Sequence, residues 1–407
     1  MYKFCELKDN EFQKFVDNYE NRNFMQTIYM NEYYKLQNKE TYLVGIKEGK
    51  NIVAAALVCL VSKFKNYKRF AIYKGYLMDY NNKKLLEFMT KNIVEFLKKK
   101  KAYMFTIEPN IIVVQRDTNA NIIQDGKNNY EVINYLNQIG YKKSNHDSQP
   151  KWTYVMDINN MSSDEIFKTF KQNTRNIINR TINKYKLCIK TVTFDELSEF
   201  KKITEDTSSR RGFNDKSLDY YRNMKKVFKE KVVFKIAELN CDIYLSDLYK
   251  EKKDYENKIN KIVGTNKKKE NYIQELNLVN KKINEITILK KDKGNIIPLS
   301  AAMFMLYGDE ILYLFSGSYK EYMQYYGQYI IQWDIIKYAC EKKYKRYNFY
   351  GIMDVFNNKG KNYGVYEFKK GFNGYVEELL GEYEYIIDRK IYKVSKFINT
   401  IKKIIKH

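Results

Sequence analysis

Histidine is almost absent from this chain of 407 residues, which contains only His146 and the terminal His407. A Ser-His-Asp triad, a Cys-His dyad or a histidine-ligated metal site would have to use His146. The five cysteines are scattered, odd in number and without a CxxC pair, a pattern typical of reduced thiols in a cytoplasmic protein. We therefore predict a site that holds no metal ion and no cofactor.

A long hydrophobic run is also missing. The longest apolar segment, IVAAALVCLV at 52–61, is about half the ~20 residues that a membrane-spanning helix needs, and we interpret it as a buried strand. The opening segment, MYKFCELKDNEF, is polar and lacks the features of a signal peptide. These two absences predict a cytoplasmic protein without a membrane span.

Acidic residues are too few to balance the basic ones. Lysine and arginine total 73 and aspartate and glutamate total 49, which gives a net charge of +24. Hydrophobic residues make up 44% and aromatic residues 16%, so the chain can bury sizeable cores in two or three domains. The charge excess predicts a polyanionic partner: nucleic acid, an acidic membrane or a phosphorylated substrate. A general abundance of solvated lysines is the alternative interpretation.

A helical hairpin stands out between residues 246 and 293. Its apolar residues recur in heptad steps: Leu248, Tyr255, Ile259 and Ile262, then Tyr272, Leu276, Val279, Ile283 and Ile286. Gly264 breaks the pattern before Lys267, Lys268 and Lys269. The spacing predicts an antiparallel coiled-coil arm of two helices, each ~30 Å long. The arm is either a structural hairpin or a basic contact for a large anionic partner.

A unit of strands, helix and strand occurs twice. Residues 51–80 have a strand-rich pattern, followed by a helical pattern to about residue 100 and a strand at 102–109. Residues 295–322 repeat it, followed by a helix and a strand at 346–352. The repeat predicts a duplicated α/β unit, and its element order resembles that of the acyl-CoA-type N-acetyltransferase (GNAT) folds.

The segment QYYGQY at 324–329 half-matches the glycine-rich loop with which acetyltransferases bind the coenzyme A pyrophosphate at a helix N-terminus. Tyr329 stands where that loop has its second glycine, and its side chain would block close approach of the backbone to a phosphate. This disfavours ordinary acetyl-CoA use in this half of the chain.

The C-terminal segment, RKIYKVSKFINTIKKIIKH at 389–407, has an amphipathic helical pattern. Its apolar stripe consists of Ile391, Val394, Ile398, Ile401 and Ile405, with lysines on the opposite face. Two placements fit this pattern: a terminal helix packed on the core, or a helix on a membrane surface.

The ordered set of motifs resembles the Fem family of tRNA-dependent peptidoglycan aminoacyltransferases. The segment YLFSGSYKEYMQYYGQYIIQWDIIKYACEKKYKRYNFYGI, at 313–352, is similar to three consecutive family motifs. Further similar segments are NFMQTIYMNEYYK (23–35), KGYLMDY (74–80), FTIEPN (105–110), SQPKWTYVMDI (148–158), KQNTRNIINRT (171–181) and VYEFKKGFNGYVEELLGEYEYII (365–387). The resemblance covers nearly the whole chain.

The resemblance implies transfer of an aminoacyl group from aminoacyl-tRNA to the side-chain amine of the third-position diamino acid of a peptidoglycan precursor pentapeptide. The acceptor would be UDP-MurNAc-pentapeptide or lipid II, the latter with peripheral contact at the inner face of the plasma membrane. The resemblance leaves the amino acid and the oligomeric state open. Because both substrates are polyanions, this activity fits the basic excess.

The resemblance also implies roles near the C-terminus. Phe368 and Lys369 match a phenylalanine–lysine pair of the family, so Lys369 would stabilise the developing oxyanion and Phe368 would wall the 3′-adenosine. Lys370 would reach a phosphate of the tRNA. In the arm, Lys267, Lys268 and Lys269 would contact the same tRNA.

Substrate-binding roles come from four further matches. Lys35 would contact the diphosphate of the acceptor, and Lys216 stands where the family tends to have an arginine for phosphate. Tyr220 follows four residues later, and Tyr319 would line the same pocket.

Two residues of the segment 102–109 complete the predicted site. Tyr103 lies on the predicted strand and would contact substrate. Glu108 replaces an aspartate of the family and would accept a proton from the attacking amine.

We thus predict an α/β protein with two GNAT-type domains and an inserted coiled-coil arm. The first domain comprises 1–150 with about 381–407, the second 151–380, and the arm 246–293. One alternative is an acyl-CoA-dependent N-acyltransferase that acts on another amine. Another is a noncatalytic RNA- or membrane-binding protein.

Overall fold

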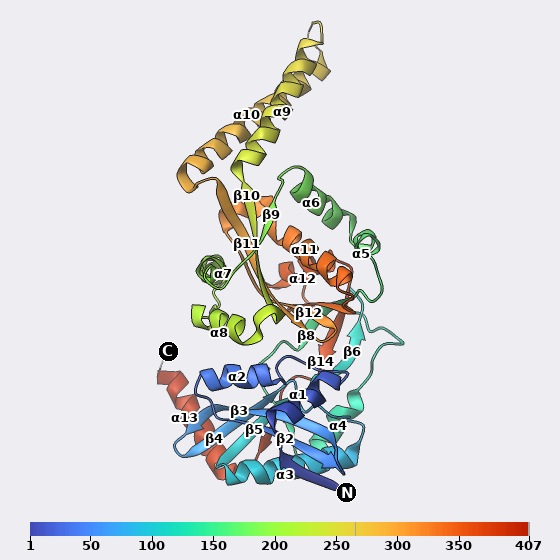
Figure 1. Cartoon of the computed structure of the whole chain (residues 1–407), viewed down its shortest axis with the longest axis vertical. Coiled ribbons are helices and arrows are strands. Elements are labelled where there is room, and N and C mark those ends of the chain that lie inside the picture. Colours follow the sequence, from blue (N-terminus) through green and yellow to red (C-terminus); the bar gives the residue numbers. More distant parts are fainter. Residues whose placement is uncertain (265, 406–407) are drawn as a thin grey trace.

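The computed structural model describes residues 1–264 and 266–405, with side chains at all of these positions except 399, 400 and 402–405. Two β-sheets follow one another along the longest axis, and a helical hairpin projects beyond the second sheet (Figure 1). The predicted arrangement of two α/β units with an inserted arm is confirmed.

The first sheet contains most of the N-terminal strands. In spatial order its strands are β1 (Tyr2–Glu6), β2 (Thr41–Glu48), β3 (Asn51–Phe64), β4 (Tyr67–Tyr73), β5 (Ala102–Glu108), β15 (Tyr383–Ile386) and β7 (Lys142–Lys143). Its helices are α1 (Asp9–Asn18), α2 (Ile28–Leu36), α3 (Lys83–Lys99), α4 (Tyr130–Gln138) and α13 (Arg389–Ile405). Neighbouring strands are antiparallel except for β4 and β5.

Strand β3 explains how this sheet is covered on both faces. Because side chains alternate along a strand, Ala54 and Ala56 enter the core under α3, whereas Ala55 and Leu57 enter the core that includes α1. The long apolar run predicted as a buried strand is therefore a central strand with helices on both sides.

The second sheet repeats this plan. In spatial order its strands are β6 (Ile112–Arg116), β14 (Tyr375–Leu379), β8 (Trp152–Asp157), β13 (Arg346–Gly351), β12 (Glu310–Ser318), β11 (Ile296–Tyr307), β10 (Val232–Asn240) and β9 (Cys188–Thr191). Its helices are α5 (Ser163–Thr169), α6 (Gln172–Asn183), α7 (Leu197–Arg211), α8 (Leu218–Phe228), α11 (Gly327–Glu341) and α12 (Tyr363–Lys370), with 3₁₀ turns at Lys229–Lys231 and Lys320–Tyr325.

The duplicated unit is β3–β4–α3–β5 in the first sheet and β11–β12–α11–β13 in the second. In both copies the strands on either side of the helix, β4 and β5 or β12 and β13, pair in parallel. Their carboxyl ends therefore meet at one edge of each sheet, a common place for binding sites in α/β folds.

The chain crosses between the sheets four times, and the first two crossings bear on one predicted boundary. Strand β6 lies within 1–150, yet it pairs with β14 of the second sheet. The first domain therefore cannot include all of 1–150, because the hydrogen bonds of β6 belong to the other sheet. After β14 the chain returns, and β15 pairs with β5. The remaining domain limits stay a prediction.

The arm consists of α9 (Cys241–Asn260) and α10 (Lys267–Lys293), and it begins a few residues earlier than predicted. Leu248, Val279, Ile283 and Ile286 are buried at its root. Farther out, the rings of Tyr255 and Tyr272 lie 6.1 Å apart. These contacts hold the two helices together as the heptad pattern predicts.

The C-terminal helix α13 does not bury its predicted stripe. Val394 and Ile401 are exposed, Ile391 and Ile398 are half-buried, and the side chain of Ile405 lies outside the described residues. A purely core-packed placement is therefore wrong. Among the described residues, no helix is both long enough and apolar enough to cross a membrane.

Candidate active site at the domain junction

Lys369 lies in the last turn of α12 with only 4% of its surface exposed. Its Nζ donates hydrogen bonds to the carbonyl oxygens of Phe349 and Gly351, both at 2.6 Å. In the described part of the chain, no carboxylate lies within ion-pair distance of this ammonium. Burial lowers the pKa of Lys369 to about 7, so the group can both hold and release a proton near neutral pH.

Aromatic rings surround this lysine. Phe368 contacts Tyr329 edge to face, with 4.9 Å between ring centroids, and contacts Phe372 at 5.4 Å. The Nζ of Lys369 lies 5.8 Å from the centre of the Tyr313 ring. Tyr329, which replaces the glycine of the acetyltransferase loop, thus packs against Phe368, the chain neighbour of Lys369.

The start of α11 is occupied by protein groups. A side chain on Gly327 would come within 2.7 Å of the Ser300 hydroxyl, so this glycine is required by packing against β11. The Gln328 amide donates to the carbonyls of Gly317 and Ala301, at 2.7 and 3.0 Å. Packing of Gly327 and the hydrogen bonds of Gln328 therefore account for the partial match of this segment to the pyrophosphate-binding loop of acetyltransferases.

Lys370 has a different environment from its neighbour. It is mostly buried, its Nζ lies 2.9 Å from the Glu367 carboxylate, and it packs over the ring of Tyr366. Burial is the largest single cause and lowers its pKa, but the hydrogen bond and charge of Glu367, together with Tyr363, outweigh burial and the net pKa is raised. The predicted phosphate contact would require this pair to open.

Glu108 and Lys74 form a buried pair in the first domain. Glu108 ends β5, Lys74 follows β4, and the parallel pairing brings these strand ends together. Lys74 Nζ lies 3.4 Å from Glu108 Oε1, while Oε2 has no hydrogen-bond partner in the described part of the chain. Burial raises the pKa of Glu108 to about 7, although Lys74 acts in the opposite direction.

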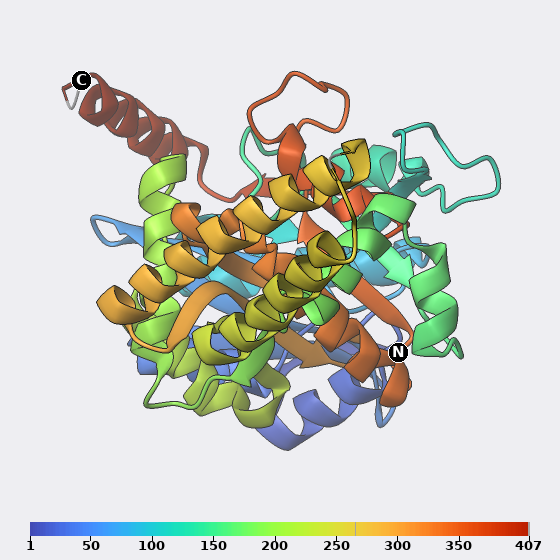
Figure 2. The same ribbon diagram turned by 90° about the horizontal axis from the view of Figure 1, so that it is seen from above.

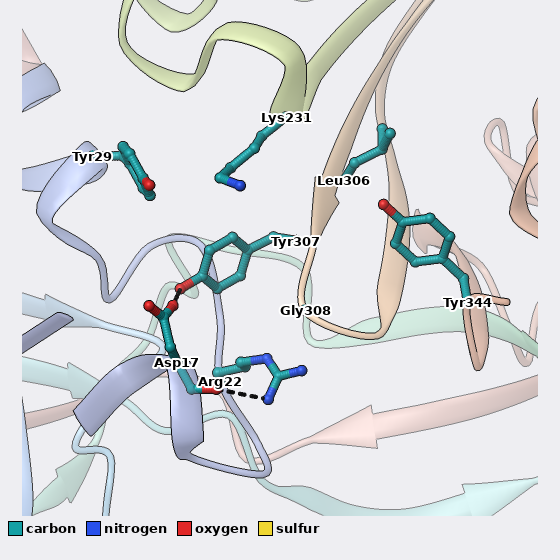
Figure 3. A pocket seen from close by; sticks show the side chains of 8 residues that line it. All are labelled: Asp17, Arg22, Tyr29, Lys231, Leu306, Tyr307, Gly308 and Tyr344. Carbon is teal, nitrogen blue, oxygen red and sulfur yellow. Dashed lines mark hydrogen bonds between the residues drawn. The ribbon is translucent and has the colours of Figure 1, made fainter. Parts of the chain in front are cut away.

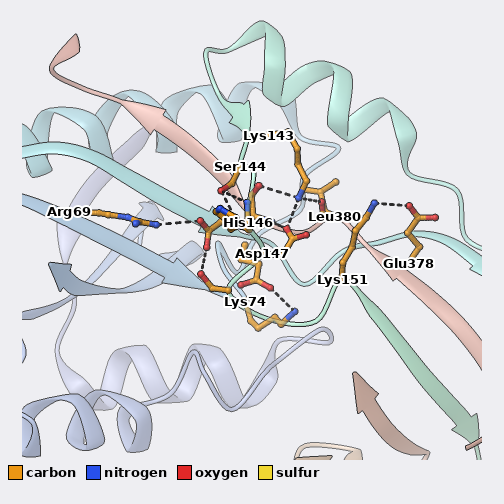
Figure 4. Close-up of polar contacts among 12 residues, drawn as sticks. Arg69, Lys74, Lys143, Ser144, His146, Asp147, Lys151, Glu378 and Leu380 are labelled. Carbon is orange, nitrogen blue, oxygen red and sulfur yellow. Dashed lines mark hydrogen bonds and ion pairs between the residues drawn. The ribbon is translucent and has the colours of Figure 1, made fainter. Parts of the chain in front are cut away.

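Other charges gather beside this pair, as Figure 4 shows. Glu382 is buried and contacts both Arg69, at 3.5 Å, and the Ser148 hydroxyl. Asp147 pairs with Lys143 at 2.6 Å. Both carboxylates add to the rise in the pKa of Glu108, because negative neighbours disfavour a further negative charge.

Tyr350 connects the two halves of the site. It lies between Phe349 and Gly351, whose carbonyls hold Lys369, and its hydroxyl donates to Gln149 at 2.8 Å. Burial raises its pKa, and the next largest cause is the charge of Glu108. Its φ of +60° is unusual for a bulky residue, so the surrounding contacts hold the backbone in this conformation.

The predicted phosphate-binding residues meet where α2 packs against α8. Tyr33 of α2 contacts Tyr220 of α8 across the junction, with 5.7 Å between ring centroids. Lys216 is exposed with its Nζ 5.4 Å from the centre of the Tyr220 ring, and Lys35 is exposed at the end of α2. Tyr319 is half-buried just after β12, where it contacts Tyr322.

Tyr103 does not join this group. It is buried near the start of β5, and Glu108 lies at the other end of that strand, ~17 Å away at the usual rise. Its hydroxyl accepts a hydrogen bond from Ser395 of α13. The C-terminal helix contacts this residue, and its predicted contact with substrate stays a prediction.

The lysines predicted to bind tRNA lie at the tip of the arm. Lys267 and Lys268 are exposed, whereas Lys269 is partly covered and its ammonium donates to the Ile262 carbonyl at 3.2 Å. Two of the three are therefore free of the arm's own contacts at their charged ends.

A polar cavity of about 290 Å³ lies elsewhere at the junction, between the N-terminal helices and the β11–β12 turn (Figure 3). The Tyr307 hydroxyl donates to Asp17 at 3.2 Å, and Arg22 pairs with Asp309 at 2.9 Å. None of the predicted site residues lines this cavity, and its contacts tie the two sheets together.

Lys74, Tyr350 and Gln149 were missed by the sequence analysis. Lys74 and Gln149 fall within segments already noted, KGYLMDY and SQPKWTYVMDI, but no local pattern marks Lys74 as buried or Gln149 as a partner of Tyr350. In the described part of the chain, no group of three or more His, Cys, Asp or Glu side chains is arranged to hold a metal ion.

Comparison with solved structures defines the fold class. A structure described as the crystal structure of FemX aligns with a TM-score of 0.74 at 21% identity, covering 96% of this chain and 99% of that one. A tandem GNAT protein from the clavulanic acid biosynthesis pathway aligns with a TM-score of 0.53 at 9% identity, covering 95% and 99%. At these identities the likeness shows the fold alone, which is that of tandem acetyltransferase-like units.

The family model of the FemAB family matches residues 7–400, and the chain belongs to this family. The protein named Aminoacyltransferase FemA from Staphylococcus epidermidis is 29% identical over 98% of this chain and 100% of its own length. The protein of the same name from Staphylococcus aureus is 27% identical over 98% of this chain and 99% of its length. The predicted resemblance to the Fem family is confirmed, and the protein is a transferase.

Proposed function

We propose that the protein transfers an aminoacyl group from aminoacyl-tRNA to the side-chain amine of the third-position diamino acid of a peptidoglycan precursor pentapeptide. The observation that carries the proposal is made on Lys369 of this FemAB family member. Its ammonium is buried and bonded to two backbone carbonyls, and in the described structure no carboxylate pairs with it. The relatives are named aminoacyltransferases, which supports the general reaction type.

The reaction joins the acceptor amine to the aminoacyl carbonyl carbon, and the ester C–O bond to the terminal ribose of the tRNA breaks. Because the ester is already activated, the protein needs chiefly to position the substrates and stabilise the oxyanion. Lys369 supplies the positive charge for the oxyanion. With its pKa near 7, it can also give a proton to the departing ribose oxygen.

Glu108 is the proposed acceptor of the proton that the amine loses. Its pKa of about 7 leaves a useful fraction of carboxylate at neutral pH, and its Oε2 is unpaired in the described structure. Tyr350 helps to position Lys369, because the carbonyls of its two backbone neighbours accept the hydrogen bonds of that ammonium.

The basic surface serves the two polyanionic substrates. Lys35 and Lys216 flank the α2–α8 junction for the phosphates of the precursor, and Lys267 and Lys268 at the tip of the arm contact the tRNA. A precursor linked to lipid would bring the protein to the inner face of the plasma membrane.

A transfer assay tests the proposal. Purified protein is mixed with tRNA charged with radiolabelled amino acids and with UDP-MurNAc-pentapeptide or lipid II, and RNase-treated tRNA and acetyl-CoA serve as alternative donors. We expect label on the precursor only with intact charged tRNA, and none with Lys369→Met. Transfer from acetyl-CoA, or no transfer to either precursor, would contradict the proposal.

A further inference from the structure

The C-terminal helix α13 packs on the body through a mixed face, in which Ser395 is buried and Ile391, Tyr392 and Ile398 are half-buried. Tyr392 donates to the Glu384 carboxylate at 2.8 Å, and the buried Ser395 hydroxyl contacts Tyr103 at 3.3 Å. At the start of the helix, Asp388 accepts the backbone N–H of Ile391 at 3.0 Å. These contacts fix the rotation of the helix about its own axis.

This rotation turns an apolar stripe toward solvent. Phe397 is 67% exposed, Val394 47% and Ile401 38%. At about 100° per residue, these three side chains fall within roughly 60° of one another on the helix surface. Such a cluster of exposed apolar side chains on one helix face is typical of an interaction site, so a partner outside the described chain is expected to cover it.

The charges around the stripe indicate the chemistry of that partner. The helix contains Arg389, Lys390, Lys393, Lys396, Lys402 and Lys403 and no acidic residue. Lys390 and Lys393 are exposed beside the stripe. Seen from above, the helix extends away from the rest of the molecule, so a broad flat surface can approach it (Figure 2).

We propose that α13 is a docking helix for the surface of an anionic lipid bilayer. Phe397, Val394 and Ile401 enter the boundary between headgroups and acyl chains, and the lysines lie among the anionic headgroups. An RNA partner would leave the apolar stripe unburied. The membrane contact itself does not depend on the proposed function. Its biological purpose does rest on that function, because a lipid-linked acceptor would be presented on such a surface.

Vesicle sedimentation tests the proposal without any acceptor. The full chain is mixed with vesicles of phosphatidylglycerol and phosphatidylcholine, or of phosphatidylcholine alone. We expect binding to the anionic vesicles, a loss of about tenfold in Phe397→Ser, and weak binding to the neutral ones. The matched control is Phe356→Ser, because Phe356 is also 67% exposed but lies in the loop before α12. Neither substitution touches a buried side chain.

Three outcomes would overturn the inference: no binding by the unmodified chain, equal binding by Phe397→Ser, or an equal loss in Phe356→Ser. A dimer in the absence of vesicles that Phe397→Ser dissociates would also overturn it, because a second copy would then cover the stripe. The double variant Lys390→Gln/Lys393→Gln should lose the preference for anionic over neutral vesicles.

The transfer assay separates this inference from the proposed function. Phe397→Ser should retain transfer to the soluble UDP-linked precursor and lose efficiency only with the lipid-linked precursor in vesicles. A chain that binds vesicles but transfers nothing would refute the function alone. A chain that transfers but does not bind vesicles would refute the docking helix alone.

Discussion

Two lysines, one in each half of the molecule, are buried to nearly the same depth but have different partners. Lys369 is 4% exposed and meets two backbone carbonyls, whereas Lys74 is 3% exposed and meets the carboxylate of Glu108. In the second domain the lysine itself has a pKa lowered to about 7. In the first domain, the carboxylate has a pKa raised to about 7.

The comparison shows that burial alone does not assign the chemistry. Carbonyl dipoles solvate an ammonium less well than water does, so the protonated form of Lys369 is destabilised and its pKa falls. Beside Lys74, the burial of Glu108 outweighs the attraction of the pair. For the proposed transfer, Lys369 would serve as the acid and Glu108 as the base.

The largest expected effect comes from removing the ammonium in the second domain. Lys369→Met should lower kcat/KM for transfer by about 1000-fold, because an oxyanion loses its positive partner. Lys370→Met, in the same turn of α12 but paired with Glu367, should cost less than about tenfold. Initial rates give both values, and thermal unfolding verifies that the variants fold. Comparable losses in the two variants would refute the distinction.

The next largest effect tests the other side of the junction. Glu108→Gln should lower kcat by about 100-fold, since the base is lost while its shape is kept. Asp147→Asn, which removes a neighbouring carboxylate, should change kcat by only a few fold. Single-turnover rates at saturating substrates measure both. A Glu108→Gln protein with unchanged single-turnover rates would exclude this residue as the base.

The pH dependence sharpens the comparison further. Glu108 acts as a carboxylate, so activity should rise as pH increases through about 7; Lys369 acts as an ammonium, so activity should fall above about 7. The profile of kcat/KM should therefore be bell-shaped with its maximum near neutrality. Lys369→Arg should remove the descending limb, because arginine stays protonated. If that limb persists in the arginine variant, another group controls it.

The smallest expected effect concerns the arm, which is remote from both lysines. Lys267→Glu/Lys268→Glu should raise the KM for charged tRNA by about three- to tenfold, leave kcat unchanged and flatten the salt dependence of binding. Lys291→Glu/Lys293→Glu, at the root of the arm, is the matched control, since both residues are also exposed. Equal effects at tip and root would indicate only a general loss of positive charge.

Much of the fold was predictable because it depends on local periodicity. The heptad spacing of 246–293 predicted the hairpin, and the repeated pattern predicted two similar units. The crossing of β6 into the second sheet was not predictable, because hydrogen bonds between residues as distant as Val376 and Arg116 leave no local pattern. The contact of Tyr103 with Ser395 of α13 was not predictable for a similar reason, since the two residues are 292 positions apart.

The sequence by itself determined the family resemblance, the basic excess, the arm and the candidate pair Phe368–Lys369, since each depends on residue identity and spacing along the chain. The tertiary structure alone decided which lysines are buried, and hence which groups have a pKa near 7. It also decided which face of α13 meets solvent. The reason is that desolvation and hydrogen bonding depend on atoms brought together from distant segments, which no local pattern records.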